Sequence, residues 1–158
     1  MKTTRRAARE LALNVLYQAD ASGIPFDEAL ATALEFSDLS GLESKGSQRA
    51  AEAREYARLL CVGVRERRDE LDGFIAELAE GWTLNRQPPV DRNILRLAIY
   101  EIKYVESVPP IVAVDEAVEL AKRYSTAESG KFVNGVLAGY LRKYGSGSEG
   151  KGIDSKDS

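Results

Sequence analysis

The fold class of this chain is indicated most clearly by the stretch Pro88-Pro89-Val90-Asp91-Arg92-Asn93-Ile94-Leu95-Arg96-Leu97-Ala98-Ile99-Tyr100-Glu101-Ile102. The two prolines suit the first turn of a helix, where a missing amide hydrogen leaves no helical hydrogen bond unmade. Asp91 follows them at the positive end of the helix dipole, where an acidic side chain is stabilising. Apolar residues then recur at the spacing of one buried helical face, at Ile94, Leu95, Ala98 and Ile102. The stretch therefore predicts an amphipathic helix that begins at a proline pair.

The same helical periodicity runs through most of the chain, whereas few segments show the alternation that is typical of strands. A first helix is expected from about Thr4 to Ala21. Six more are expected from apolar stripes within residues 26–34, 56–64, 71–78, 94–102, 114–121 and 132–141. We therefore predict an all-α fold of about seven helices, arranged in two packed layers or a pair of small bundles.

Proline, glycine, serine and threonine mark the expected helix ends. These markers are Gly23 with Pro25, the Ser- and Gly-rich loop from Ser37 to Ser47, Gly81, Pro109 with Pro110, and Thr126 or Ser125 as a cap of the last helix. From Gly145 onward the chain is Gly, Ser and charge without periodicity, which is typical of disorder. A chain of 158 residues suits one hydrophobic core rather than two. We expect one helical domain over residues 1–144 and a disordered tail over residues 145–158.

The composition argues against catalysis. Histidine is absent, which removes the commonest general base, the usual nucleophile triads and most zinc sites. Cys61 is the only cysteine, so an internal disulfide is excluded, and its apolar neighbours Leu60 and Val62 predict a buried thiol. We therefore expect no catalytic residues, no metal site and no cofactor, that is, a protein that is not an enzyme.

The sequence also argues against a membrane partner. No window approaches the apolar run that a membrane helix needs. The basic start of the chain runs into Glu10, Asn14 and Gln18 rather than into the apolar core of a secretory signal. A cytoplasmic protein is expected.

Cations at the start of the first helix give the clearest functional signal. Lys2, Arg5, Arg6 and Arg9 are spaced so that a helix that begins early presents them on one side, away from the expected buried face. Cations at a helix N-terminus oppose its dipole, and like charges at these spacings repel. The chain as a whole is acidic, with 25 Asp and Glu against 22 Lys and Arg. The cations therefore predict a bound polyanion whose phosphates they contact; a solvated basic end that aids solubility is the alternative.

Aromatic and amide side chains extend this hypothesis. Tyr17 lies on the same side of the first helix as the cations and suits stacking on a base, contact with a protein partner or packing inside the protein. Lys131, Phe132 and Asn134 combine a cation, a ring and an amide, a set suited to unstacked RNA bases, although Phe132 alone also suits the core. Trp82 follows a helix-ending glycine and is expected to fill a corner between helices.

Five blocks of the sequence together resemble one known family. They are Arg5-Arg6-Ala7-Ala8-Arg9-Glu10-Leu11-Ala12-Leu13 with Leu16-Tyr17, Gly81-Trp82-Thr83-Leu84-Asn85-Arg86, Val90 to Glu101, Asp115-Glu116-Ala117-Val118-Glu119-Leu120-Ala121-Lys122, and Ser129-Gly130-Lys131-Phe132-Val133-Asn134-Gly135-Val136-Leu137. They span roughly residues 3 to 143, and long blocks in the right order are more specific than one short motif. On these blocks the chain resembles the NusB family of bacterial transcription antitermination factors.

The resemblance implies a NusB-like bundle of seven helices and a role in transcription. Members of the family bind the box A sequence of nascent ribosomal RNA leader transcripts as single-stranded RNA. They do so with NusE, a small-subunit ribosomal protein, within an RNA polymerase antitermination complex. The sequence leaves open whether the free protein is a monomer or a homodimer.

The motif match also implies roles for single residues. The RNA-binding positions are Arg5, Arg6 and Arg9 with the adjoining Lys2, and Lys131, Phe132 and Asn134. The protein-partner positions are Tyr17, Asp91 and Glu128. The chain departs from the family pattern at Gln87, where an apolar residue is common, and at Ala127, where an acid is frequent; the second departure falls on the expected partner face.

Two other classes of function stay open. The same helical module resembles the N-terminal domain of ribosomal RNA cytosine methyltransferases, but such an enzyme needs a further domain that binds S-adenosylmethionine. Its nucleophilic cysteine precedes a proline, whereas Cys61 precedes Val62. A helical protein-interaction adaptor without RNA affinity is the third class, and it would be preferred if the arginines made no contribution to binding.

Overall fold

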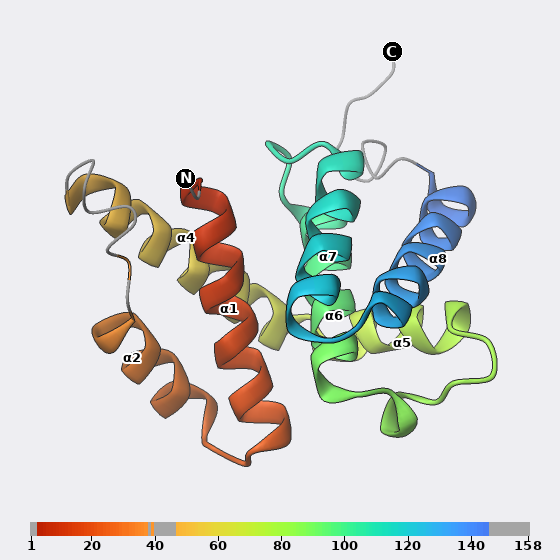
Figure 1. Cartoon of the computed structure of the whole chain (residues 1–158), viewed down its shortest axis with the longest axis horizontal. Helices are drawn as coiled ribbons and strands as arrows, with labels where there is room; N and C mark the ends of the chain where they lie inside the picture. The colour runs from red at the N-terminus through yellow and green to blue at the C-terminus, as the bar shows by residue number, and fades with distance from the viewer. Residues whose placement is uncertain (1–2, 38, 40–46, 146–158) are drawn as a thin grey trace. The chain divides into compact units, whose positions relative to one another are not determined.

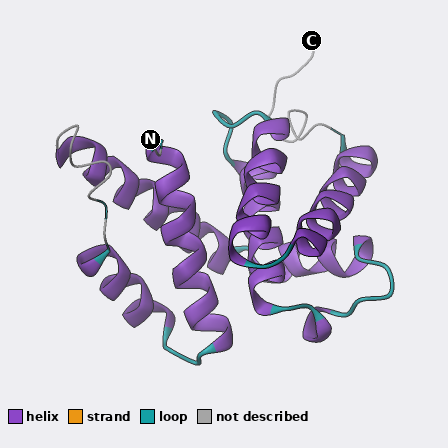
Figure 2. Cartoon of the chain, in the orientation of Figure 1, coloured by secondary structure: helices purple, strands orange, loops and turns teal. Residues whose placement is uncertain are grey.

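The computed structural model describes residues 3–37, 39 and 47–145. Within these ranges the chain forms seven α-helices and one short 3₁₀ helix, and no strand occurs among them (Figure 1, Figure 2). The all-α prediction is confirmed. Lys2, most of the expected loop from Ser37 to Ser47 and the expected tail from residue 146 onward lie outside the described residues.

The helices group into two compact units, Met1–Arg65 and Glu66–Ser158. The first unit holds α1 (Thr4–Ala21), α2 (Phe26–Phe36) and α4 (Ser47–Glu66) up to Arg65. The second holds α5 (Arg68–Leu78), the 3₁₀ helix η1 (Leu84–Arg86), α6 (Pro89–Tyr104), α7 (Pro110–Tyr124) and α8 (Ala127–Tyr144). The expectation of one helical domain over residues 1–144 stays a prediction.

α1 begins and ends where the sequence predicted. Thr3 caps it, because the Thr3 hydroxyl accepts a hydrogen bond of 3.0 Å from the backbone N–H of Arg6. Gly23, in the turn to α2, has a φ of +72°, a conformation that glycine adopts without steric cost. α1 packs against α2 and also meets α4, where Cys61 Sγ lies 3.8 Å from the carbonyl oxygen of Ala12. α1 is therefore in contact with both of the other helices that the structure describes in its unit.

α6 is the central helix of the second unit, in contact with α5, α7 and α8. It begins at the proline pair as predicted, with Pro89 in its first turn. Its predicted apolar face is buried, and so are residues between the members of that face: Ile94, Leu95, Leu97, Ala98, Ile99 and Ile102. Burial extends beyond the predicted face because neighbouring helices cover α6 on more than one side.

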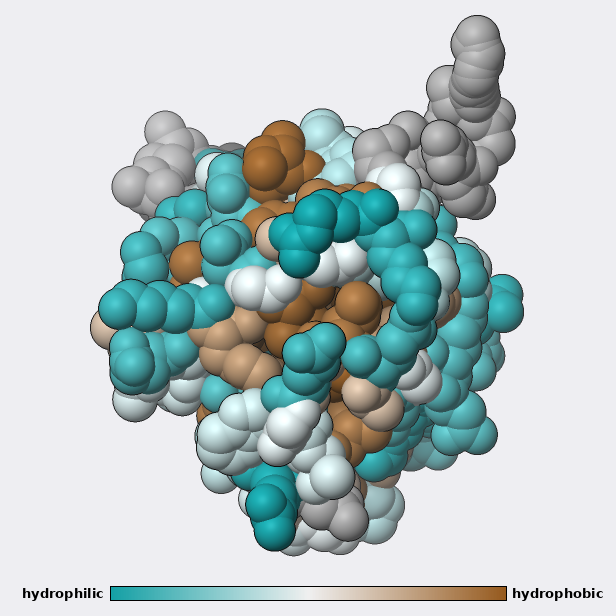
Figure 3. All heavy atoms as spheres, turned by 90° about the vertical axis from the view of Figure 1, so that its right-hand side faces the viewer, coloured by the Kyte–Doolittle hydropathy of each residue, from teal (hydrophilic) through white to brown (hydrophobic). Residues whose placement is uncertain are grey.

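α5 and α8 pack through a cluster of aromatic rings. The ring of Phe74 meets those of Tyr140 and Tyr144 edge-on, with centroids 5.2 and 4.9 Å away. Glu77 on α5 accepts hydrogen bonds from Lys143 and from the Tyr144 hydroxyl. Figure 3 views the side on which α5 and α8 lie in Figure 1, and it shows apolar surface bordered by hydrophilic residues. Aromatic packing thus joins the two outer helices of this unit.

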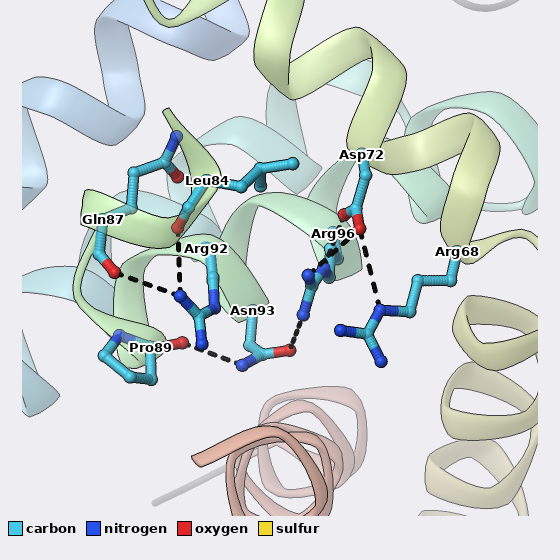
Figure 4. A network of polar contacts seen from close by, with 8 residues as sticks. All are labelled: Arg68, Asp72, Leu84, Gln87, Pro89, Arg92, Asn93 and Arg96. Atoms are coloured by element: carbon cyan, nitrogen blue, oxygen red, sulfur yellow. Dashed lines mark hydrogen bonds and ion pairs between the residues drawn. The ribbon is translucent and has the colours of Figure 1, made fainter. Parts of the chain in front are cut away.

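An ion pair between the buried Arg96 and the half-buried Asp72 connects α5 to α6. The Arg96 guanidinium donates to both carboxylate oxygens of Asp72, at 2.7 and 3.1 Å, and to Asn93 Oδ1 at 3.0 Å (Figure 4). Arg68 approaches the same carboxylate at 3.6 Å from the more exposed side. Removing one partner of such a pair leaves a poorly compensated charge, so the pair holds α5 and α6 against each other.

Arg92 anchors the segment that leads into α6. Its guanidinium donates to the carbonyl oxygens of Leu84, at 3.0 Å, and of Gln87, at 3.4 Å (Figure 4). Asn93 donates to the carbonyl oxygen of Pro89 at 2.8 Å. These bonds satisfy backbone acceptors of an irregular segment, which would otherwise need water. They position η1 and the residues on either side of it.

Candidate nucleic-acid interface

The starts of α1 and α4 place three arginines close together in the first unit. Arg5 is exposed, and Arg6 and Arg49 are half-buried. Arg49 Nε donates a hydrogen bond of 3.2 Å to the Thr4 hydroxyl, which joins the two helix starts. We refer to Arg5, Arg6 and Arg49 as the N-terminal basic cluster.

Arg5 is oriented by an aromatic ring. Its Cζ lies 3.8 Å from the ring centre of the buried Tyr56 on α4, a cation–π contact that limits the freedom of a long side chain. The first turn of α1 contains no acidic residue. No side chain of that turn therefore offsets the unfavourable interaction between the arginines and the positive end of the helix. Oriented guanidinium groups at such a position suit an incoming anion.

The sequence analysis missed Arg49 and misjudged Arg9. Arg49 is separated by 45 residues from its partner Thr4, so no local spacing connects it with the start of the chain. Arg9 is only 4% exposed, and the prediction that it faces solvent beside Arg5 and Arg6 is wrong. α1 is buried at residues 7–9 and 11–13, and at about 100° per residue these positions cover more than half of its circumference. Arg9 as an RNA contact stays a prediction.

Tyr17 lies well away from the basic cluster. It is more than three helical turns beyond Arg5, about 18 Å along the axis of α1. Tyr17 is 37% exposed, which leaves area for a partner. The first unit therefore separates the predicted partner residue Tyr17 from the arginines predicted to bind RNA.

The start of α8 holds the second predicted RNA-binding group. Thr126 caps the helix, accepting a hydrogen bond of 2.9 Å from the Ser129 backbone N–H. Lys131 and Asn134 are exposed. The Lys131 ammonium lies 3.5 Å from the carboxylate of Glu128, an exposed pair that contributes little stability. Both charges are therefore available to a ligand at small energetic cost.

The third member of this group, Phe132, lies beside residues predicted for a different role. Phe132 is half-buried and lines a pocket of about 240 Å³ together with Trp82, Gln87, Pro88, Asp91, Glu128 and Ser129. We refer to it as the Trp82 pocket. The structure thus brings Asp91 and Glu128, predicted to meet a protein partner, together with Phe132, predicted to meet RNA.

Trp82 does not fill a corner between helices as expected. It is 51% exposed, and its ring meets that of Phe132 at a centroid distance of 6.5 Å and an angle of 64°. The reason is that Trp82 lies in the irregular segment between α5 and η1, at the wall of the pocket. Sequence reasoning also assigned no role to Gln87, although its departure from the family pattern was a signal.

Asp91 is buried at the base of the pocket. It is 3% exposed, and its Oδ2 accepts a hydrogen bond of 2.8 Å from the Ser129 hydroxyl. This bond links the start of α6 to the start of α8. Asp91 was expected only to favour the helix dipole and to meet a partner at the surface. Its burial makes it accessible through the pocket alone.

The described residues hold neither a cluster of metal-ligating side chains nor a reactive thiol. No group of three or more His, Cys, Asp or Glu side chains over residues 3–37, 39 and 47–145 is placed to hold a metal ion. Over the same ranges, none of the helices combines the length and apolar character needed to cross a bilayer. Cys61 is buried, and burial raises the pKa of its thiol to about 12. A thiol of that kind is a poor nucleophile at neutral pH.

Comparison with known proteins identifies relatives over most of the chain. A model of the NusB family matches residues 6–142. The transcription antitermination protein NusB of Symbiobacterium thermophilum is 47% identical over 139 residues, which cover 88% of this chain and 90% of that protein. The NusB of Salinispora tropica is 45% identical over 140 residues, 89% of this chain and 96% of that protein.

Solved structures agree with this result. NusB of T. maritima has 36% sequence identity and a TM-score of 0.72, and the match covers 96% of this chain and 99% of that chain. A crystal structure of the antitermination factors NusB and NusE in complex with dsRNA matches with 29% identity and a TM-score of 0.73, over 91% of this chain and 100% of that chain.

Proposed function

The chain belongs to the NusB family, and on that basis we propose that it is a transcription antitermination factor that binds RNA together with a NusE-type ribosomal protein. A related NusB, 29% identical, is known in a complex with NusE and dsRNA. The N-terminal basic cluster is the observation that supports RNA binding most directly. Arg5 and Arg6 oppose the dipole of α1, and a bound polyanion accounts for that unfavourable placement.

Within this proposal, Arg5, Arg6 and Arg49 contact phosphate oxygens. Guanidinium groups bind phosphate bidentately and release counterions from the RNA. Lys2 adjoins them in sequence and adds charge. Arg9 is buried and is assigned to positioning α1 rather than to the first contact with RNA.

Lys131 and Asn134 form a second set of RNA contacts, on α8. Lys131 supplies a cation, and the Asn134 amide can both donate to and accept from a base edge. Contacts of the second kind are needed for sequence selection, because phosphate contacts alone are almost independent of sequence. The RNA that we propose is the single-stranded box A sequence of ribosomal RNA leaders, read jointly with the NusE-type protein.

The proposed activity is assembly rather than chemistry, in the cytoplasm where transcripts are made. The chain has no histidine, and the pKa of its one thiol is raised by burial to about 12. Incubation with labelled S-adenosylmethionine and ribosomal RNA is expected to transfer no methyl group. Transfer that disappears in Cys61→Ser would instead support the methyltransferase class.

Binding of box A RNA with and without the NusE-type protein tests the proposal. Single-stranded box A RNA, a scrambled strand of equal length and a box A duplex are titrated into the chain at several salt concentrations. We expect salt-dependent binding of single strands, weak selectivity for the chain alone, and stronger preference for box A when the partner is present. Linkage requires that RNA and partner strengthen each other by the same factor. Equal affinity for all three RNAs with and without partner would contradict the proposal.

A further inference from the structure

Tyr56 on α4 brings an aromatic ring to the N-terminal basic cluster. The residue is 9% exposed, and the Cζ atom of Arg5 lies 3.8 Å from the centre of its ring. That separation is van der Waals contact between carbon atoms. Arg5 itself is exposed. A buried tyrosine thus lies against an exposed cation of the proposed RNA surface.

α4 meets the first turn of α1 at two positions that are two helical turns apart. Arg49 donates a hydrogen bond of 3.2 Å to the Thr4 hydroxyl, and Tyr56 lies against Arg5, the next residue of α1. Residues seven apart share one side of a helix, so a single face of α4 makes both contacts with the start of α1 (Figure 1). Arg5 and Arg49 are therefore each held by a side chain of the other helix.

The contact with the ring is compatible with the binding of phosphate. The face of an aromatic ring is negative and attracts a cation above it. An arginine stacks on a ring through the face of its guanidinium. Phosphate oxygens are instead bound by N–H groups that lie in the plane of the guanidinium. The ring of Tyr56 and an RNA phosphate therefore use different parts of the Arg5 guanidinium.

An arginine that is held in place before RNA arrives binds phosphate more tightly than a free one. Arginine has a long side chain with a large rotamer entropy. Binding removes this freedom, and the loss weakens affinity unless the side chain is already ordered. The ring of Tyr56 restricts Arg5 in the free chain and so reduces the loss.

We propose that Tyr56 is a positioning residue, which orients the Arg5 guanidinium for an RNA phosphate through a cation–π contact. The inference rests on the proposed function, because RNA is the ligand that Arg5 meets. Tyr56 is buried, so its ring acts on the RNA through Arg5 rather than by stacking on a base.

A double-mutant cycle tests whether Tyr56 acts through Arg5. Tyr56→Leu should weaken binding of single-stranded RNA by about three- to tenfold, the range for one long side chain that must be ordered on binding. In the Arg5→Ala background the same substitution should have no further effect. Fluorescence titration at one salt concentration measures the four affinities. An equal loss in both backgrounds, or no loss in the wild-type background, would overturn the proposal.

Fluorination of the ring keeps the proposal testable if Tyr56→Leu does not fold. Tyr56→Phe retains the face of the ring and should bind RNA with an affinity close to that of wild type. Phenylalanines with increasing numbers of fluorine atoms at this position keep nearly the same shape, while fluorine withdraws negative charge from the face of the ring. RNA affinity should fall as fluorine atoms are added. Equal affinity across the series would overturn the proposal.

Phe26→Leu is the matched control for loss of a ring. Phe26 on α2 lies under Arg65, whose Cζ atom is 4.4 Å from the ring centre. This is a contact of the same kind in the same unit, at the end of α4 away from the N-terminal basic cluster. Its loss should leave RNA affinity unchanged. A loss of affinity equal to that of Tyr56→Leu would overturn the proposal, because loosening of the unit would then be the cause.

The Arg5 side chain reports the contact without any RNA. Its Nε–H resonance, assigned by its absence in Arg5→Lys, should be shifted upfield by the ring in wild type and in Tyr56→Phe. The shift should disappear in Tyr56→Leu, and a resonance that does not respond to the ring would overturn the proposal. A wild-type chain that bound no RNA would contradict the proposed function. A chain that bound RNA equally with and without the ring would overturn this inference alone.

Discussion

The first turn of α1 differs from the first turns of α6 and α8 in the sign of the charge that it places at the positive end of the helix dipole. The first turn of α1 contains no acid and two arginines, whereas α6 begins with Asp91 and α8 with Glu128. The positive end of a helix favours acids and disfavours cations. Charge at the start of α1 therefore opposes stability, and charge at the other two supports it. A binding surface is easiest to recognise in a sequence where it works against the local structure.

The Trp82 pocket illustrates the opposite case. Asp91 and Glu128 are where a stable helix would place them, so the sequence offers a sufficient structural reason for each. Only the folded chain shows that Asp91 is buried beside Gln87 and that one oxygen of each lacks a donor among the described residues. The N-terminal basic cluster is unfavourable for the helix dipole, which can be seen in the sequence. The pocket is unusual only because two buried acceptors lack donors, which can be seen only in the folded chain.

The largest expected effect comes from the ion pair between α5 and α6. Arg96→Ala leaves the half-buried Asp72 carboxylate without its bidentate partner, and it should lower the free energy of unfolding by about 3 kcal/mol, the lower end for breaking a fully buried pair. The N-terminal basic cluster belongs to the other unit, so this substitution does not alter its arginines directly. Denaturant titration measures the change. Arg68→Ala removes the more exposed partner of the same carboxylate and should lower the free energy of unfolding by at most about 1 kcal/mol. Equal losses in the two variants would refute the structural role of the Arg96–Asp72 pair.

A smaller effect, on RNA affinity, is expected from the basic cluster. Replacing Arg5, Arg6 and Arg49 together by Ala should weaken binding of single-stranded RNA by about 10- to 100-fold and reduce the salt slope by about two units, at roughly 0.7 for each lost phosphate contact. Fluorescence titration over a salt series measures both. Arg58 is an exposed arginine of α4 outside the cluster. Arg58→Ala is therefore the control for the loss of Arg49, which lies on the same helix. An unchanged slope in the triple variant would remove the cluster from the RNA surface.

Charge reversal at the starts of α1 and α8 should change the free energy of unfolding by less than Arg96→Ala does. The two reversals should change it in opposite directions. Arg6→Glu places an acid in the first turn of α1 and should raise the free energy of unfolding by about 0.3–1 kcal/mol while it weakens RNA binding. Glu128→Lys should lower the free energy of unfolding by a similar amount. Thermal unfolding and RNA titration of both variants decide the matter. If Arg6→Glu destabilised the chain, the arginines would be structural and the contrast between the helix starts would disappear.

Much of the fold was predictable because its signals are local. Thr3, the turn at Gly23 and the proline pairs fix the ends of α1, α2, α6 and α7 through backbone chemistry that a few neighbouring residues decide. The all-α class follows from periodicity repeated in each segment. These predictions needed no knowledge of which helices pack together.

The remainder depended on contacts between distant segments. Arg49 reaches the start of α1 from 45 residues away, and the two sides of the Trp82 pocket, near Gln87 and near Ser129, come together only through packing of α6 with α8. Arg9 was misjudged because the spacing of charged residues shows which of them lie on the same side of a helix. It does not show how much of that helix is covered by the rest of the protein. Trp82 was misjudged because large aromatic residues are usually buried, whereas Trp82 lies in an irregular segment at the wall of a pocket.

The smallest effect concerns Cys61, whose thiol is expected to react very slowly in the folded chain at neutral pH. Burial raises the pKa of its thiol from 9.0 to about 12, so the folded chain holds almost no thiolate at pH 8. A thiol reagent such as a disulfide-based chromogen should label the native chain only as fast as the chain opens, and at the ordinary rate in denaturant. Fast labelling of the native chain would place Cys61 at the surface and reopen the question of a reactive cysteine.

The same thiol also gives a pH dependence whose sign is fixed. Because the pKa is higher in the folded state than in the unfolded state, the unfolded chain releases the proton first as the pH rises. The contribution of Cys61 to stability is therefore fully present below pH 9.0 and is lost as the pH rises toward about 12. Cys61→Ala should remove this part of the alkaline destabilisation, although the variant is less stable overall because a small cavity replaces the sulfur. Unfolding curves at pH 8 and pH 10.5 measure the difference: a gap between wild type and variant that narrows at the higher pH agrees with a buried, protonated thiol, and a gap that stays constant contradicts it.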